Sequence, residues 1–199
     1  ELINKIGSEG TLIIPTFNWD FCKGKEFCYH RTMSLSGSLG NFALKRKDFS
    51  RTQNPIYAFE FTGRDKDLIC SLEHKSCFGL DSPFGYLIKS NGKNLFIDID
   101  YKDGFTLCHV AEETAGVDYR YLKKFSGSYR DREGKVFSKQ VNMYVRDPKS
   151  KVTMTGIHKD FDNALIQINA LKKINVNNTC LQIIDVKKAY DLMVKDIRN

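Results

Sequence analysis

An apolar run followed closely by a short helix with two chemically active side chains constrains this chain most. Leu95 to Ile99 predicts a buried strand, and Thr106-Leu107-Cys108-His109-Val110-Ala111-Glu112 predicts a helix after a short turn. His109 and Glu112 share one face of that helix, because residues three apart are neighbours on a helix surface. We expect Thr106 to be the N-cap, which places His109 in the first turn.

This pair is typical of a general base and the carboxylate that orients it. The positive end of the helix dipole disfavours the imidazolium, and Glu112 favours it. We expect His109 to be mostly neutral near pH 7, as a base must be. The alternative, which the spacing alone leaves open, is a surface histidine and glutamate on an ordinary helix. Cys108 is expected in the core, because adjacent side chains on a helix point about 100° apart.

Composition places the chain among ordinary globular proteins. With 199 residues and 41% hydrophobic content it can bury a core, and we expect a single domain over 1–199. The sequence has no apolar run near the roughly 20 residues that span a bilayer, so no membrane partner is expected. The net charge of +7 suits a phosphorylated cofactor, whereas a basic stripe or motif for nucleic acid is absent from the sequence. Locally, residues 98–118 carry six acids against one base, which suits a cationic amine acceptor.

Cysteine spacing argues against both a disulfide framework and a metal centre. The scattered thiols predict reduced, buried cysteines in a cytoplasmic protein. They are Cys22, Cys28, Cys70, Cys77, Cys108 and Cys180. Cys22, Cys28 and His30 lack the spacing of common zinc sites, so we expect no metal. Nucleotide-binding glycine loops and the Gly-x-Ser-x-Gly of serine hydrolases are also absent from the sequence.

Apolar segments with strand and helix patterns alternate and predict an α/β fold. Strands are expected at 11–15, 56–63, 95–99 and 180–184, and helices at 38–47, 65–72, 160–174 and 186–197. Another helix should begin at Ser82-Pro83, and 18–37 should form a long loop. Residues 119–146 predict a small β-rich insert of short strands broken by Gly127 and Gly134. We expect Leu39 and Phe42 to face inward, and His158 to lie on the surface.

A series of short motifs runs along the chain in a recognisable order. They are Gly10-Thr11-Leu12-Ile13-Ile14-Pro15-Thr16-Phe17, Arg51-Thr52-Gln53-Asn54-Pro55, His74, Phe78-Gly79, Ser82-Pro83, Gly92-Lys93-Asn94-Leu95, the Thr106, His109 and Glu112 set, and Tyr119-Arg120. In this order and at these spacings the chain resembles the aminoglycoside 3-N-acetyltransferase family, over roughly residues 9 to 146.

The resemblance implies a three-layer α/β/α sandwich around a mixed sheet. It implies an N-acetyltransferase that uses acetyl-CoA and transfers the acyl group directly to an amine of an aminoglycoside or another amino sugar. A homo-oligomer is compatible with it. The expected site residues are His109 as base, Glu112 as its partner and Thr106 at the oxyanion, Ser82 and Thr16 at the cofactor, and Asp20, Glu113 and His74 at the substrate.

Two features depart from the family pattern. Thr52 and Asn54 stand where the family turn has Ser and His, and Asn54 leaves an amide in place of an imidazole. Residues 1–6 match the tail of a helix, so we expect an upstream segment that helps bind the cofactor's phosphates to be missing. A non-catalytic binding module is therefore the alternative function, and the joint presence of His109 and Glu112 opposes it.

Overall fold

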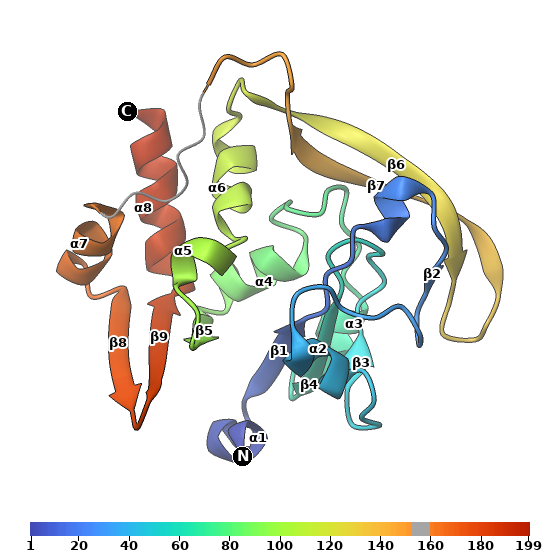
Figure 1. The fold of residues 1–199 in the computed structure, drawn as a ribbon, viewed down its shortest axis with the longest axis horizontal. Coiled ribbons are helices and arrows are strands. Elements are labelled where there is room, and N and C mark those ends of the chain that lie inside the picture. The colour runs from blue at the N-terminus through green and yellow to red at the C-terminus, as the bar shows by residue number, and fades with distance from the viewer. Residues whose placement is uncertain (153–159) are drawn as a thin grey trace. The chain divides into compact units, whose positions relative to one another are not determined.

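The computed structural model describes residues 1–152 and 160–199, so His158 lies outside the described residues (Figure 1). Contacts divide the chain into two compact units. The first comprises Glu1–Cys77 and Leu122–Met143, and the second comprises Phe78–Tyr121 and Tyr144–Asn199. The single domain over 1–199 and the insert at 119–146 stay predictions. Among the described helices, none has the length and apolar character needed to cross a bilayer.

The first unit is built around an antiparallel sheet of order β1-β4-β3. Its elements are α1 (Leu2–Ile6), β1 (Thr11–Pro15), the 3₁₀ helix η1 (Asp20–Lys23), β2 (Phe27–Cys28), α2 (Ser38–Ala43), β3 (Ser50–Arg51), β4 (Phe59–Gly63) and α3 (Lys66–Cys70). Ile14, Ala43 and Phe49 form a buried cluster on which Leu12 packs. The predicted strand at 11–15 is confirmed, and it pairs with β4 from Thr11↔Gly63 to Pro15↔Phe59.

Two long strands replace the short strands predicted around 119–146. They are β6 (Arg120–Arg130) and β7 (Val136–Arg146). β6 runs through Gly127, where a side chain would meet Phe21 at 2.8 Å, so the glycine permits close packing and does not end the strand. Gly134 lies in the turn with φ +85°, a conformation that suits glycine. The expected break at Gly127 is therefore wrong.

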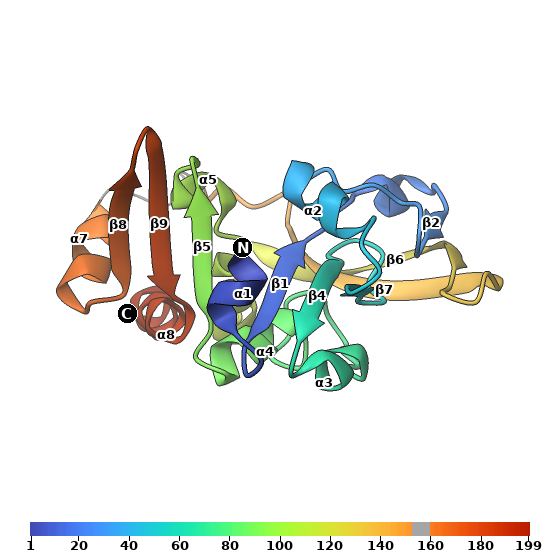
Figure 2. The same ribbon diagram turned by 90° about the horizontal axis from the view of Figure 1, so that it is seen from below.

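The second unit contains the antiparallel sheet β5-β9-β8 and the helices packed near it (Figures 1 and 2). Its elements are α4 (Pro83–Lys89), β5 (Lys93–Ile97), α5 (Tyr101–Gly104), α6 (Cys108–Ala115), α7 (Asp160–Gln167), β8 (Leu171–Val176), β9 (Thr179–Asp185) and α8 (Val186–Arg198). The C-terminal helix buries Val186, Ala189, Tyr190 and Met193, which form the single stripe of an amphipathic helix. α8 contacts α6, and Tyr190 donates to the Thr114 hydroxyl at 3.1 Å.

The mixed α/β class is confirmed, while several element boundaries differ from the prediction. The helix predicted over 160–174 ends at Gln167, Asn169 has φ +52°, and Leu171–Val176 pairs with β9 as a strand. α2 ends at Ala43, and its Leu39 and Phe42 are 45% and 60% exposed rather than buried. Pairing with β9 thus decides the structure of a segment whose apolar pattern alone indicates a helix.

Candidate active site

The helix that carries His109 begins slightly later than predicted. α6 starts at Cys108, and its N-cap is Leu107, whose side chain has no polar atom to cap the helix. Backbone carbonyls of the preceding tight turn accept the first N–H groups of the helix instead. The His109 N–H donates to the backbone carbonyl oxygen of Thr106 at 3.1 Å. Thr106 as N-cap is therefore wrong, but the predicted position of His109 in the first turn is confirmed.

One buried carboxylate holds the catalytic candidate in place. Glu112 Oε2 lies 2.6 Å from His109 Nδ1 and 2.8 Å from Arg120 Nε. Its Oε1 accepts from the Tyr119 hydroxyl at 3.2 Å, and the carboxylate side chain is 7% exposed. The ring of Phe78 lies against the imidazole, with centroids 5.1 Å apart. These contacts fix the plane of the ring and direct its Nδ1 at Glu112.

The protonation of this pair differs from the expected neutral imidazole. Burial lowers the pKa of His109, but the hydrogen bonds and charges of Cys108 and Glu112 outweigh it and raise the pKa to about 9. Burial raises the pKa of Glu112, but His109 and Arg120 outweigh it, and the net pKa is lowered. A helix dipole contributes about 0.3–1 kcal/mol, less than a short charge-assisted hydrogen bond. The expectation of a neutral ring is therefore wrong for the free protein.

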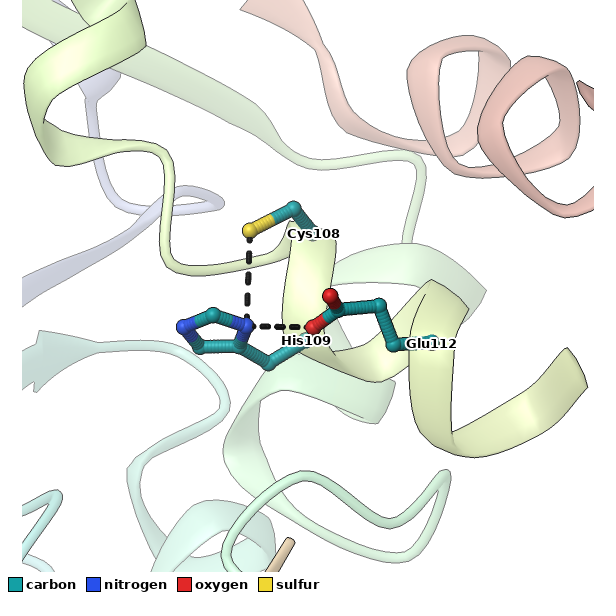
Figure 3. A group of neighbouring side chains, drawn as sticks. All are labelled: Cys108, His109 and Glu112. Carbon is teal, nitrogen blue, oxygen red and sulfur yellow. Dashed lines mark hydrogen bonds and ion pairs between the residues drawn. The ribbon is translucent and has the colours of Figure 1, made fainter. Parts of the chain in front are cut away.

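Cys108 is not a core residue. It is half-buried, and its Sγ lies 3.6 Å from His109 Nδ1, so the two side chains converge (Figure 3). The angle of about 100° separates the Cα–Cβ directions of adjacent residues, but the next bonds can rotate back toward each other. All six cysteines are free thiols in the structure, and burial was correctly predicted only for Cys77, since Cys70 is exposed and the others are half-buried.

A cavity of about 670 Å³ opens beside His109, between α5, α6, α7 and α8. Asp103, Asp160 and Asp196 belong to its lining together with Glu112. The lining also includes Lys102, but its ammonium forms an ion pair at 3.5 Å with Asp162, a residue that is not part of the lining. The cavity therefore suits a cationic ligand.

Comparison with known proteins identifies the family. A family model described as aminoglycoside 3-N-acetyltransferase matches residues 1–198. The chain belongs to the aminoglycoside 3-N-acetyltransferase family. Its predicted enzyme class, an N-acetyltransferase that uses acetyl-CoA, is confirmed by this membership.

Solved acetyltransferase structures share the fold. Aminoglycoside acetyltransferase AAC(3)-Xa matches with a TM-score of 0.78 and 16% identity, over 96% of this chain and 76% of that one. Sisomicin-bound AAC-VIa matches with a TM-score of 0.79 and 16% identity, over 99% of this chain and 82% of that one. AAC-IIIb in a binary complex with CoASH matches with a TM-score of 0.74 and 15% identity, over 96% of this chain and 78% of that one. Comparison with curated protein sequences gives no match.

The family turn at Arg51–Pro55 has a structural role in this member. Thr52 Oγ1 accepts from Phe59 N at 2.9 Å. Asn54 Oδ1 accepts from the backbone N–H groups of Ile56 and Tyr57, both at 2.9 Å. Both departures from the family pattern thus hold backbone in place, and Asn54 stabilises a tight turn.

Ser82 caps α4 as predicted, with Pro83 in the first helical position. Its hydroxyl accepts from Gly85 N, and the residue is fully buried. In the structure Ser82 therefore caps a helix. That Ser82 also contacts the cofactor stays a prediction.

The remaining predicted site residues are not part of the lining of the cavity beside His109. Thr16, Asp20 and His74 belong to the other compact unit. Thr16 is fully buried, Asp20 pairs with Lys25 at 3.0 Å, and His74 Nδ1 lies 2.9 Å from a backbone carbonyl. Glu113 follows Glu112 on α6, is half-buried, and is not part of the lining of the acidic cavity. The binding roles of these residues stay predictions.

The groups that complete the site come from several elements, and their spacing in the sequence predicts no role for them. Tyr119 and Arg120 are part of the family pattern, but nothing local shows that both reach Glu112. Asp160 and Asp196 lie on α7 and α8, far along the chain from α6. An amphipathic pattern on α8 indicates its buried face, but only the fold shows which end of that helix approaches His109.

Proposed function

We propose that this protein acetylates an amine of a polycationic aminoglycoside by direct transfer from acetyl-CoA, with His109 as the general base. The observation that carries the proposal is the pair of His109 and Glu112 at the wall of an acidic cavity. Two relatives with the same fold support it, since one binds sisomicin and another binds CoASH.

The residues around His109 fit the reacting ends of both substrates. Thr106 and Phe105 line the cavity beside the imidazole and offer a hydroxyl and an apolar wall to an acetyl group. The aspartates attract ammonium groups and repel phosphates, so the phosphates of the cofactor belong outside this lining. When bound, acetyl-CoA supplies a thioester carbonyl for the amine to attack and a thiolate as leaving group.

His109 moves the proton in this reaction. Its Nδ1–H points at Glu112, which leaves Nε2 to act on the acceptor. In the free protein the ring is protonated, and an ammonium that enters the cavity favours loss of that proton by repulsion. The ammonium loses one proton to solvent to become the attacking amine. As the C–N bond forms, Nε2 takes a second proton from that nitrogen, and it gives this proton to the sulfur as the C–S bond breaks. A base of this kind contributes roughly 10²–10⁴-fold in rate.

Glu112 and Thr106 act on the charges that develop. Glu112 stabilises the imidazolium that forms during transfer, and Arg120 with Tyr119 keeps the carboxylate in place. Thr106 belongs to the cavity lining, and its hydroxyl is our candidate donor to the thioester oxygen.

The acidic lining favours a polycation over a sugar with one amine. Asp103, Asp160 and Asp196 come from three helices, so they can meet several ammonium groups of one acceptor. A single amine has fewer charges to place against them. We therefore favour an aminoglycoside over an amino sugar of a surface polysaccharide.

An acceptor screen with acetyl-CoA, read by mass spectrometry, tests this function. We expect acetylation of at least one aminoglycoside, with a kcat/KM at least tenfold above that of glucosamine. The matched control for substitution of His109 is His30→Ala. It changes an exposed histidine in the other unit and should keep wild-type turnover. Absence of aminoglycoside acetylation by a folded, CoA-binding protein would contradict the proposal, as would equal kcat/KM for both acceptors.

A further inference from the structure

Three different donor atoms meet beside the proposed base. Cys108 Sγ, His109 Nδ1 and a Glu112 carboxylate oxygen all lie within 4.8 Å of one another (Figure 3). The thiol and the carboxylate both contact the same ring nitrogen, at 3.6 and 2.6 Å. The general-base reaction proposed above uses Glu112 and Nε2 of His109, and it gives the Cys108 thiol no role.

The convergence on one nitrogen argues against a relay through the ring. A cysteine nucleophile in a triad contacts one imidazole nitrogen, while the orienting carboxylate contacts the other. Here Nδ1 faces both Cys108 and Glu112, so the carboxylate cannot support proton transfer from the thiol across the ring. Donor atoms that point at one place are instead the arrangement of a chelating site.

The distance between the sulfur and the ring nitrogen agrees with a tetrahedral zinc ion, and the distance to the carboxylate requires a small shift. Bond lengths of about 2.3 Å to sulfur and about 2.0 Å to nitrogen place those two ligand atoms roughly 3.5 Å apart. Sγ and Nδ1 of Cys108 and His109 are 3.6 Å apart. The contact of 2.6 Å between Nδ1 and Oε2 would open to about 3.3 Å, a shift of less than about 1 Å by the Glu112 carboxylate.

The donor set also selects the class of metal. Thiolate and imidazole ligands suit Zn²⁺ and its neighbours, whereas Mg²⁺ and Ca²⁺ take oxygen ligands. Tyr119 and Arg120 hold the Glu112 carboxylate, as outer groups hold the ligands of known metal sites. The positive charge of Arg120 also competes for Oε2, which limits the affinity.

We propose that Cys108, His109 and Glu112 form a three-ligand site for Zn²⁺, with the fourth position open to the acidic cavity, and that occupancy inhibits the enzyme. The three residues line that cavity, so an ion can enter from it. As the ion binds, the thiol and the imidazolium release their protons to solvent. The bound cation draws Glu112 away from its hydrogen bond and places positive charge where an ammonium must enter. The inhibition, unlike the binding, rests on the proposed function.

Cobalt(II) added to the purified metal-free protein tests the site, because a cobalt–thiolate bond absorbs in the near ultraviolet. We expect one equivalent of cobalt to give this band, and Zn²⁺ but not Mg²⁺ to remove it. Cys108→Ser and Cys108→Ala should abolish the band, while His109→Gln and Glu112→Gln should weaken cobalt binding at least tenfold. Cys70→Ser, at an exposed thiol in the other unit, should leave the band unchanged.

Wild-type protein without a thiolate band, or Cys108→Ser protein with an undiminished band, would overturn the proposal. Acetyl transfer gives a second readout, in which Zn²⁺ should inhibit wild-type enzyme at least tenfold more strongly than Cys108→Ser enzyme. Equal inhibition of the two proteins would contradict the inhibitory role. The spectrum does not depend on turnover, so a protein that binds cobalt and acetylates nothing would remove the proposed function and keep the metal site.

Discussion

Replacement of Glu112 by Gln should separate the charge of this residue from its geometry. A glutamine amide has nearly the shape of the carboxylate. Its oxygen can accept from His109, as Oε2 does now, and can stay beside the Arg120 guanidinium, whose Nε lies 2.8 Å from Oε2. Its NH₂ group can donate to Tyr119, whose hydroxyl accepts as readily as it donates. Glu112→Gln therefore keeps the contacts and removes the negative charge.

The size of the effect follows from the difference between two kinds of hydrogen bond. Hydrogen bonds to charged groups contribute about 1.5–3 kcal/mol, and neutral ones about 0.5–1.5 kcal/mol. The imidazolium formed at His109 during transfer thus loses about 1–2 kcal/mol of stabilisation, which corresponds to a rate about 5- to 30-fold lower. Glu112→Ala also loses the orientation of the ring, and its rate should fall at least about a hundredfold.

Steady-state acetyl transfer to an aminoglycoside is the assay, with kcat as the readout. Glu73→Gln, at an exposed glutamate, is the matched control and should keep the wild-type kcat. Circular dichroism should show all three proteins folded at the assay temperature. A kcat for Glu112→Gln equal to the wild-type value would refute the reasoning, because the carboxylate charge would then have no part in transfer.

Further predictions concern binding and stability. Asp196→Asn should raise the KM of a polycationic acceptor several-fold with little change in kcat, and added salt should shrink the difference between the variants. Burial, partly offset by Arg51, raises the pKa of Glu60 from 4.5 to about 7, so the free energy of unfolding should fall by about 3 kcal/mol as pH rises through that interval. Urea unfolding at pH 5 and pH 8 checks this. Glu60→Gln should remove this fall, while the separate fall caused by the raised pKa of His109 remains. Gly85→Ala should lower the free energy of unfolding by about 3 kcal/mol or prevent folding, because the new Cβ would lie 2.1 Å from the Leu80 carbonyl oxygen; a thermal melt like that of wild-type protein would count against it.

Local patterns were sufficient for the centre of the site. His109 and Glu112 are three residues apart on one helix, so their contact at 2.6 Å follows from helix geometry alone. Ser82 followed by Pro83 likewise predicts the start of α4 from capping chemistry. These inferences succeed because every participating atom belongs to one short segment.

Groups brought in by the tertiary fold escaped prediction. Arg120 starts a strand and Asp196 belongs to the C-terminal helix, and no spacing rule links either to α6. The sequence does not predict the raised pKa of His109, because that pKa depends on the contact with Cys108 and on burial as well as on Glu112. The segment that forms β8 appeared helical because its pairing with β9 is not visible in its own apolar pattern.

The most direct test of the central claim is the turnover of His109→Ala on an aminoglycoside that the wild-type enzyme acetylates. Binding of CoA should be measured on the same preparation by calorimetry. We predict a kcat lower by roughly 10²–10⁴-fold with CoA affinity unchanged, as expected when only a general base is removed. A His109→Ala enzyme that keeps near-wild-type kcat would contradict it.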